Sequence, residues 1–160
     1  MTIKAMNHID ILLVEDSPAD VLITREAFKE FRLVNTLHVV EDGVEALAFL
    51  NREGKYASVP LPDLILLDLN LPRKSGREVL AEIKTDPRFK SIPVIILTTS
   101  PSEQDVLESY EHHANCYIIK PVGFDNFVEA MKSIRQFWFS VVTLPPEAPY
   151  GKDPNQSSAD

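Results

Sequence analysis

Carboxylates follow two apolar runs of the sequence, where a strand would end. The run IDILLV leads to Glu15 and Asp16, and the run at residues 64–67 leads to Asp68. A buried carboxylate is unfavourable unless it is paired, hydrogen-bonded or bound to a metal. If the two runs form neighbouring strands, three carboxylates meet, and charges about 4 Å apart repel by roughly 4 kcal/mol. Mg²⁺ suits such a cluster, because it takes one or two carboxylates and keeps exchangeable waters.

Two later apolar runs end in hydroxyl and ammonium side chains, which are able to bind phosphate oxygens. IPVIILT leads to Thr98 and Thr99, and CYIIK ends in Lys120. In open α/β sheets, ligands bind beyond the carboxyl ends of the strands. We therefore expect acids, a hydroxyl and an ammonium at one edge of the sheet. A nucleophile, a counter-ion, a hydroxyl donor and a cation are what metal-assisted phosphoryl transfer requires.

The elements that must position these residues are five apolar runs with helical patterns between them. The runs are continuous rather than alternating, which is typical of parallel strands covered on both faces. Strands that alternate with helices imply right-handed crossovers and a doubly wound α/β sheet. Ser17 and Pro18 are typical of a helix N-cap and first turn. The helical stripes lie within residues 21–31, 43–51, 79–83, 106–110 and 124–138.

Composition narrows the class of protein. The chain has 160 residues, 44% of them hydrophobic and 25% charged, as in an ordinary one-domain globular protein. Its net charge of −8 argues against direct DNA binding. The single cysteine, Cys116, gives no sign of an oxidising compartment. Neither a signal peptide nor an apolar run of membrane-spanning length is present, so we expect a cytoplasmic protein with no membrane association.

Five motifs, in order and spacing, resemble a response-regulator receiver domain of two-component signalling. They are VEDS, LLDLNLP, PRKSG, LTTS and YIIKP, within residues 9 to 139 or so. The resemblance implies a flavodoxin-like receiver fold: a five-stranded parallel sheet of order 2-1-3-4-5 with helices on both faces. Nothing of domain size follows the fifth helix, so we expect a single-domain regulator, with a receiver domain at residues 1–143 and a proline-rich, disordered tail at 144–160.

The resemblance also implies the reaction. Asp68 would accept a phosphoryl group from a phosphohistidine of a sensor histidine kinase. Mg²⁺, for which Mn²⁺ or Ca²⁺ can substitute, would bind to Asp16, Asp68 and the backbone carbonyl of Asn70, with Glu15 acting through a water.

The remaining motif residues would read out the phosphoryl group. Lys120 would pair with it, Thr98 would hydrogen-bond to it and move inward, and Tyr117 would follow by turning its ring. Taken singly, each has an ordinary structural reading: a surface lysine, a β-branched strand residue and a core aromatic residue.

The end of the fifth helix, QFWFSVVTLP, exposes more apolar surface than one core can cover. Phe137, Trp138, Phe139 and Val141 lie around most of the helix, which favours a protein interface over burial within the chain. This ending and the long loop at residues 52–62 resemble the cyanobacterial phytochrome-associated response regulators. That subgroup implies a light-sensing histidine kinase as partner and a homodimer.

The sequence leaves three rival functions and a zinc site to be weighed. One rival is a receiver-like adaptor that never takes a phosphoryl group, and the complete set of acids, Thr98 and Lys120 argues against it. A Mg²⁺-dependent phosphatase with an aspartyl-phosphate intermediate would carry a D-x-D after the first strand, which is absent. A flavin-binding module would need a Ser/Thr-rich phosphate loop where acids stand. His112, His113 and Cys116 could suggest zinc, but they lack a fourth ligand, and histidines that close a helix explain them better.

Overall fold

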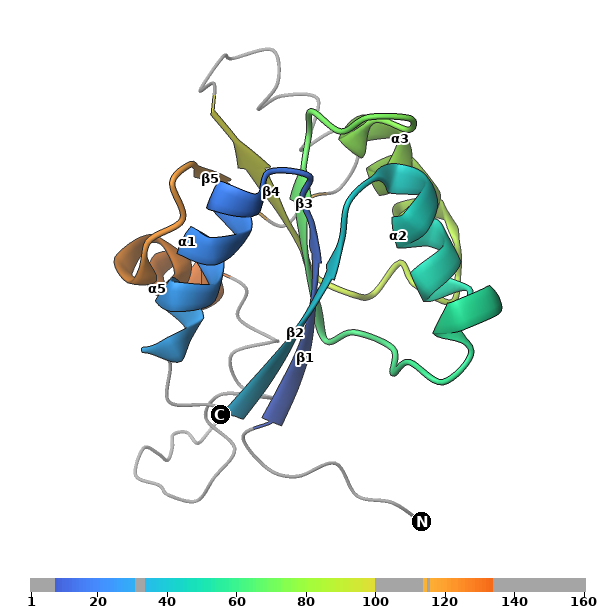
Figure 1. Cartoon of the computed structure of the whole chain (residues 1–160), viewed down its shortest axis with the longest axis horizontal. Helices are drawn as coiled ribbons and strands as arrows, with labels where there is room; N and C mark the ends of the chain where they lie inside the picture. Colours follow the sequence, from blue (N-terminus) through green and yellow to red (C-terminus); the bar gives the residue numbers. More distant parts are fainter. Residues whose placement is uncertain (1–7, 31–33, 100–113, 115, 134–160) are drawn as a thin grey trace.

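The sheet has the predicted strand order. The computed structural model describes residues 8–30, 34–99, 114 and 116–133. Five strands are parallel throughout, in the order β2-β1-β3-β4-β5 (Figure 1). Their bounds are β1 (His8–Val14), β2 (Val34–Val40), β3 (Leu64–Asp68), β4 (Val94–Thr98) and β5 (Cys116–Ile119).

Helices cover both faces of the sheet, as the continuous apolar strands predict. On one face lie α1 (Pro18–Lys29) and α5 (Phe124–Ser133), and on the other lie α2 (Gly43–Leu50) and α3 (Gly76–Thr85) (Figure 1). The helix expected near residues 106–110 lies outside the described residues. None of the helices in the described part is long and apolar enough to cross a bilayer.

Two apolar cores form because successive strand residues point to opposite faces. Ile11 and Leu13 of β1 pack on the α1–α5 side, whereas Leu12 and Val14 pack on the α2–α3 side. The α1–α5 core is closed by an aromatic pair, Phe28 of α1 and Phe127 of α5, with ring centroids 4.3 Å apart. The sheet between these cores is a rigid base for residues at its carboxyl edge.

Polar caps begin three helices close to this carboxyl edge. The predicted cap Ser17 accepts a hydrogen bond from the backbone N–H of Asp20, 3.2 Å away. Asp42 caps α2 through the N–H of Glu45 at 2.8 Å. Ser75 caps α3 and forms a reciprocal capping box with Glu78. Caps satisfy the free amides of a first turn, so they fix where each helix begins.

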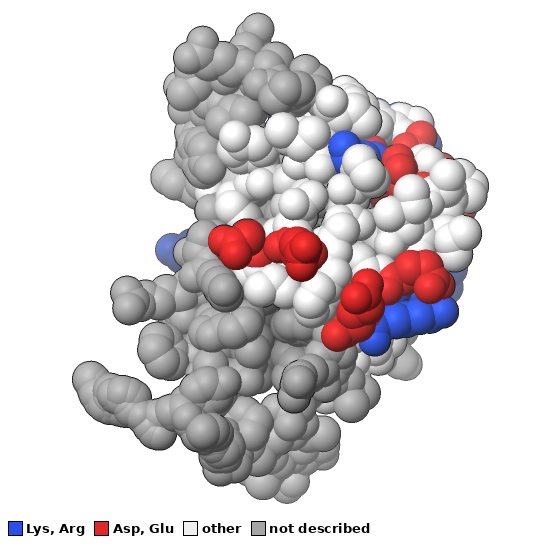
Figure 2. Space-filling view, turned by 90° about the vertical axis from the view of Figure 1, so that its left-hand side faces the viewer, with Lys and Arg blue, Asp and Glu red and all other residues white. Residues whose placement is uncertain are grey.

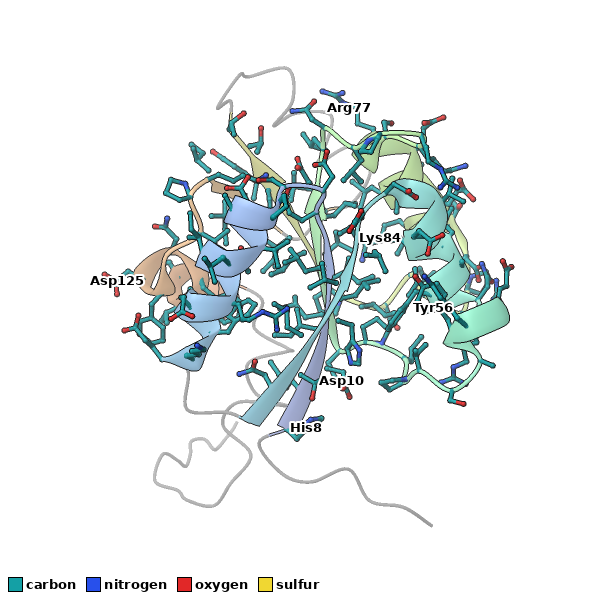
Figure 3. The ribbon with its side chains drawn as sticks, in the orientation of Figure 1. His8, Asp10, Tyr56, Arg77, Lys84 and Asp125 are labelled. Atoms are coloured by element: carbon teal, nitrogen blue, oxygen red, sulfur yellow. The ribbon has the colours of Figure 1, made fainter. Side chains whose placement is uncertain are left out.

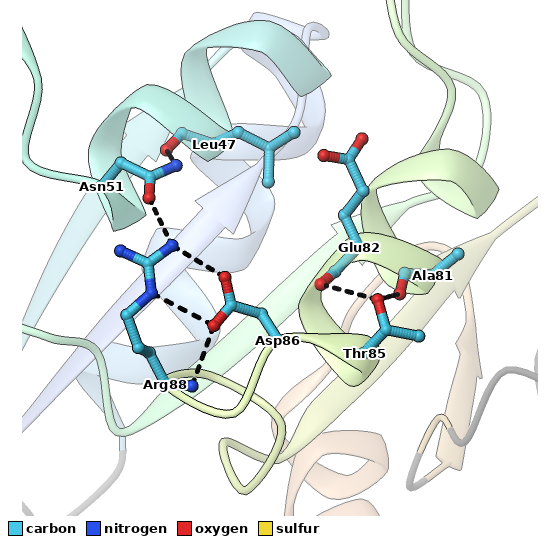
Figure 4. Close-up of polar contacts among 7 residues, drawn as sticks. All are labelled: Leu47, Asn51, Ala81, Glu82, Thr85, Asp86 and Arg88. Carbon is cyan, nitrogen blue, oxygen red and sulfur yellow. Dashed lines mark hydrogen bonds and ion pairs between the residues drawn. The ribbon is translucent and has the colours of Figure 1, made fainter.

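Polar contacts also tie α2 to α3 at the opposite edge. The Arg88 guanidinium donates to Asp86 at 2.7 Å and to the Asn51 side chain at 2.8 Å (Figure 4). Asn51 in turn donates to the Leu47 carbonyl at the end of α2 (Figure 4). The two helices of this face are therefore joined where they end.

The connection at residues 52–62 lies mostly at the surface, as expected, and it contains a short helical turn. The turn is a 3₁₀ helix, η1 (Gly54–Tyr56), and Tyr56 packs against Phe49 of α2, with ring centroids 5.4 Å apart. The Tyr56 hydroxyl donates to the Glu45 carboxylate. Burial and this acceptor raise the pKa of Tyr56 to about 12. Tyr56 therefore anchors the loop to α2 through its ring and its hydroxyl.

Candidate functional site

The three predicted acids meet at the carboxyl edge of the sheet. Glu15 follows β1 and Asp68 ends β3, and these strands are neighbours, with Val14 opposite Leu67. One oxygen each of Glu15, Asp16 and Asp68 lies within 4.8 Å of the others. Among the described residues this is the only such group of His, Cys, Asp or Glu. Glu15 and Asp68 are 1% and 5% exposed, while Asp16 faces solvent.

Backbone amides orient the two buried acids. The Ser17 N–H donates to Glu15 Oε2 at 3.2 Å, and the Asn70 N–H donates to Asp68 Oδ1 at 3.0 Å. In each case the second carboxylate oxygen faces Lys120. Carboxylates held in this way keep their lone pairs aimed into the site without side-chain rearrangement.

Lys120 is the cation of the site. Its Nζ lies 2.6 Å from Glu15 Oε1, 3.0 Å from Asp68 Oδ2 and 3.0 Å from Asp20 Oδ2. Its backbone N–H donates to the Thr98 carbonyl at 2.8 Å, which fixes the start of the segment that follows β5. The side chain is 8% exposed, so these ion pairs are poorly screened by solvent.

Burial and neighbouring charges shift the pKa of both partners. Burial raises the pKa of Glu15 to about 7; the negative Asp68 adds to the rise, and the hydrogen bond from Lys120 opposes it. Burial lowers the pKa of Lys120, but its hydrogen bonds to Glu15, Asp20 and Asp68 outweigh burial and raise it above the ordinary value. Lys120 therefore stays charged at neutral pH, whereas Glu15 exchanges a proton there.

Thr98 and Tyr117 lie on the two strands beyond β3. Thr98 is the last residue of β4 and is buried, and Leu97 beside it is the register partner of Asp68. Tyr117 of β5 is half-buried and packs against the α2–α3 core. The structure thus brings Thr98 to the predicted edge and places Tyr117 one strand further out.

The connection from β3 to α3 closes tightly behind Asp68. Gly76 lies against the backbone of Asp68 and Leu69, where a Cβ atom would collide with both. Its N–H donates to the Leu69 carbonyl at 3.1 Å. Arg73 has a φ of 66°, in the left-handed region, and its guanidinium pairs with Asp42 at 3.2 Å. These contacts fix the loop that carries Asn70.

Asp20 is a member of the site that the motifs did not reveal. It is the third residue of α1, and its carboxylate faces Lys120 across 100 residues of sequence. One signal in the sequence could have identified it. A predicted helix capped by Ser17 begins at the same edge as Glu15 and Asp16, so an acid in its first turn lies near them.

Several sequence predictions concern residues beyond those described. The expected interface residues Phe137, Trp138, Phe139 and Val141 lie outside the described residues, as do His112 and His113. Cys116 is described, and it is half-buried against the α1–α5 core.

Figure 3 shows labelled side chains at both edges of the sheet. Arg77, in the first turn of α3, lies at the edge where the acids meet, and His8 and Asp10 lie at the opposite edge. At that opposite edge His38 and His8 flank Asp10, at 3.2 and 3.9 Å. The donor set suited to a divalent cation is therefore at the carboxyl edge, where carboxylate oxygens converge.

Comparisons with known proteins agree with this geometry. Residues 11–132 match the family model described as the response regulator receiver domain. Response regulator Rcp1 of Synechocystis sp. is 50% identical over 135 residues, which are 84% of this chain and 92% of Rcp1.

Two similar solved structures are the Mn²⁺-bound form of Rcp1 and the phosphorylated cyanobacterial phytochrome response regulator RcpA. Their TM-scores are 0.71 and 0.72. Each is 50% identical in sequence and covers 86% of this chain and 99% of its own.

Proposed function

Because the chain belongs to the response regulator receiver family, we propose that Asp68 accepts a phosphoryl group from a sensor histidine kinase. One observation carries this proposal above the others. The buried Asp68 carboxylate lies 3.0 Å from the ammonium of Lys120, and one of its oxygens lies within 4.8 Å of oxygens of two further acids, Glu15 and Asp16. A phosphorus atom next to Asp68 would therefore meet a nucleophile, the ammonium of Lys120 for its oxygens, and acids that can hold a metal.

In the proposed reaction an oxygen of Asp68 attacks the phosphorus of a phosphohistidine. A bond from this oxygen to phosphorus forms, the bond from phosphorus to the imidazole nitrogen breaks, and its electron pair returns to the imidazole. Lys120 neutralises charge on the phosphoryl oxygens. The product is an acyl phosphate on Asp68.

The donor atoms fit a hard divalent cation such as Mg²⁺. Asp16, Asp68 and the Asn70 carbonyl would hold it, with Glu15 acting through a water. When bound, the cation neutralises the acids and polarises a phosphoryl oxygen. The need for it is electrostatic: Lys120 is one positive charge facing Glu15 and Asp68 at close range, and a phosphoryl group adds more negative charge.

Thr98 and Tyr117 would carry the signal away from the site. The Thr98 hydroxyl would hydrogen-bond to the phosphoryl group, and the half-buried Tyr117 ring would move into the space that Thr98 leaves. A new charge would thereby bias two arrangements of the surface beyond β4.

The proposed partner is a histidine kinase of the phytochrome type, in the cytoplasm. The identity of 50% to RcpA, a phytochrome response regulator by its description, supports this partner. The α1 surface is also suited to protein contact, because Leu22 and Ile23 are 59% and 41% exposed. Figure 2 shows uncharged surface on the described part of this face, with acidic and basic groups between.

A homodimer through Phe137, Trp138, Phe139 and Val141 is part of the proposal. It rests on the sequence, because large exposed aromatic side chains mark interfaces. If analytical ultracentrifugation shows that the wild-type chain is a monomer, the proposed homodimer is wrong.

The phosphatase alternative has less support than the signalling role. A receiver domain is a phosphoacceptor that keeps one phosphoryl group for a time, whereas a phosphatase releases many per chain. A turnover assay with small phosphomonoesters separates the two, because release of many phosphates per chain would favour the phosphatase.

Asp68→Asn should abolish labelling by acetyl phosphate in the presence of Mg²⁺, because an amide oxygen is a far weaker nucleophile than a carboxylate. Labelling is measured as a mobility shift in a phosphate-affinity gel. Asp86→Asn is the matched control, since Asp86 lies at the opposite edge and pairs with Arg88. Equal labelling of Asp68→Asn and wild type would contradict the assignment.

A further inference from the structure

Asp20 lies in the site but has no part in the reaction as proposed above. It belongs to the first turn of α1, and its carboxylate Oδ2 is 3.0 Å from the Lys120 Nζ. The contact joins the start of α1 to the residue that follows β5, two elements that lie far apart in the sequence.

The Lys120 ammonium has one carboxylate partner for each of its N–H donors. An ammonium carries three N–H donors, and three carboxylates lie within 3.0 Å of it: Glu15, Asp20 and Asp68. Glu15 and Asp68 also belong to the group of acids suited to a cation, whereas Asp20 does not. A cation and a phosphoryl group therefore compete with Lys120 for two of its three partners and leave the third.

The cap of α1 holds Asp20 independently of the acids. Its backbone N–H donates to the Ser17 hydroxyl at 3.2 Å, and Pro18 occupies the first turn. The Ser17 N–H in turn donates to Glu15, so this short segment supports two partners of Lys120. The Asp20 side chain is 29% exposed, more than the other two, and lies on the solvent side of the ammonium.

We propose that Asp20 is a positioning residue that keeps the Lys120 ammonium in the site while its other partners are exchanged. This inference rests on the proposed function, because the incoming group is the phosphoryl group on Asp68. Once that group forms, the oxygens of Glu15 and Asp68 turn to the cation and the phosphorus. Asp20 retains one N–H of Lys120, which leaves the other two directed at phosphoryl oxygens. Without Asp20, the ammonium turns toward water.

The test is binding of beryllofluoride, which mimics a phosphoryl group on an aspartate, at saturating Mg²⁺. Titrations followed by ¹⁹F NMR compare the wild type with Asp20→Ala, Asp20→Asn and Glu26→Ala. Asp20→Ala should bind about tenfold more weakly, the effect of losing one hydrogen bond to a charged group. Asp20→Asn should stay within about threefold of wild type, because its amide oxygen still accepts from Lys120.

Glu26→Ala is the control on the same helix, since Glu26 is exposed and forms a local ion pair with Lys29; it should match wild type. Circular dichroism checks the fold of each variant. If Asp20→Ala does not fold, Asp20→Ser replaces it, because a serine side chain is too short to reach the ammonium.

Two results would overturn the inference. Asp20→Ala could bind as tightly as wild type, or Asp20→Asn could bind as weakly as Asp20→Ala. The second result would mean that Asp20 acts only through its charge at the start of α1. Failure of the wild type itself to bind beryllofluoride would contradict the proposed function, which is a different outcome from a wild type that binds and an Asp20 series that does not vary.

Discussion

Glu15 links the site to pH at the scale of a single residue. Burial and the negative Asp68 raise its pKa to about 7, so near neutral pH the metal-free protein carries a proton there about half of the time. In the proposed site Glu15 acts through a metal-bound water, and a divalent cation held there would favour the ionised carboxylate and so the loss of that proton. We therefore expect metal binding and proton release at this residue to be coupled.

The apparent affinity for Mg²⁺ should fall as pH is lowered from 8 to 6. Below the pKa of Glu15 each pH unit should weaken binding by up to about tenfold, because the protonated, neutral form attracts the cation and its water less than the carboxylate does. Isothermal titration calorimetry at three pH values measures the trend. Glu15→Gln, which has no proton to lose, should bind more weakly at pH 8 and show a flatter dependence. An equally steep dependence in Glu15→Gln would show that another group is responsible.

The raised pKa of Glu15 also makes the free energy of unfolding of the metal-free protein depend on pH. A carboxyl group whose pKa is higher in the folded than in the unfolded state favours folding when protonated. The contribution of Glu15 is therefore fully present below pH 4.5 or so, and it is lost as pH rises through about 7. Added Mg²⁺ should offset the loss if it binds at the proposed site, because it would favour the ionised form of the folded state.

Sequence reasoning placed Glu15, Asp16, Asp68, Thr98 and Lys120 at one edge because a single rule governs them. Each follows an apolar strand, and parallel strands share their carboxyl edge. Asp20 escaped because it sits on a helix, where no strand-end rule applies. Its meeting with Lys120 depends on the angle at which α1 crosses the sheet, which is set by packing of side chains such as Phe28 on Phe127.

The β3–α3 connection is the element on which the position of Asp68 depends. Gly76 begins α3 directly against the backbone of Asp68 and Leu69. Arg73 spans from this loop to Asp42, the cap of α2. Gly43, beside that cap, is in turn pressed against Lys74, where a Cβ would collide. The loop is thus clamped between two helix starts.

Gly76→Ala should destabilise the fold and slow labelling of Asp68. The added methyl group meets backbone atoms that cannot rotate away, and such overpacking costs about 1–3 kcal/mol. Because the displaced backbone belongs to Asp68 itself, labelling should slow under conditions in which the variant remains folded. Urea denaturation and the rate of labelling by acetyl phosphate measure the two effects.

Gly123→Ala is the matched control for this element. Gly123 follows β5 near the same edge, but within the described residues a Cβ placed there meets no atom within 4 Å beyond its own chain neighbours. Gly123 caps α5, where alanine is less favourable than glycine, so the free energy of unfolding should fall by no more than about 1 kcal/mol, and labelling of Asp68 should keep its rate. Similar losses in the two variants would show that the loop after β3 is not specially constrained.

The conformation of this loop could not be predicted from the sequence. Gly76 was matched as part of a motif, but the left-handed backbone of Arg73 has no signature in its residue type, because arginine seldom adopts it. The Asp42 ion pair that accompanies it joins two connections, and their approach depends on how α2 and α3 pack. Contacts between loops depend on tertiary packing, which hydrophobic periodicity does not encode.

At the scale of the whole molecule, the strand order accounts for the site. With β1 and β3 as neighbours in the centre, the carboxylates after them are forced together, and β4 and β5 bring Thr98 and Lys120 from one side. The fold class followed from continuous apolar runs and alternating helices, and the order followed from the resemblance. The aromatic end of the fifth helix and the tail remain predictions, because they lie outside the described residues.

The proposed function depends on the Asp68 carboxylate being the group that receives the phosphoryl group. It is tested most directly by locating the modification in wild-type protein after reaction with acetyl phosphate and Mg²⁺. Borohydride reduces an acyl phosphate to an alcohol, which marks the residue permanently, and tandem mass spectrometry then identifies it. The account predicts the mark at residue 68 alone, and its complete loss when Mg²⁺ is chelated. A mark at Glu15, Asp16 or Asp20, or one that forms equally well without a divalent cation, would contradict it.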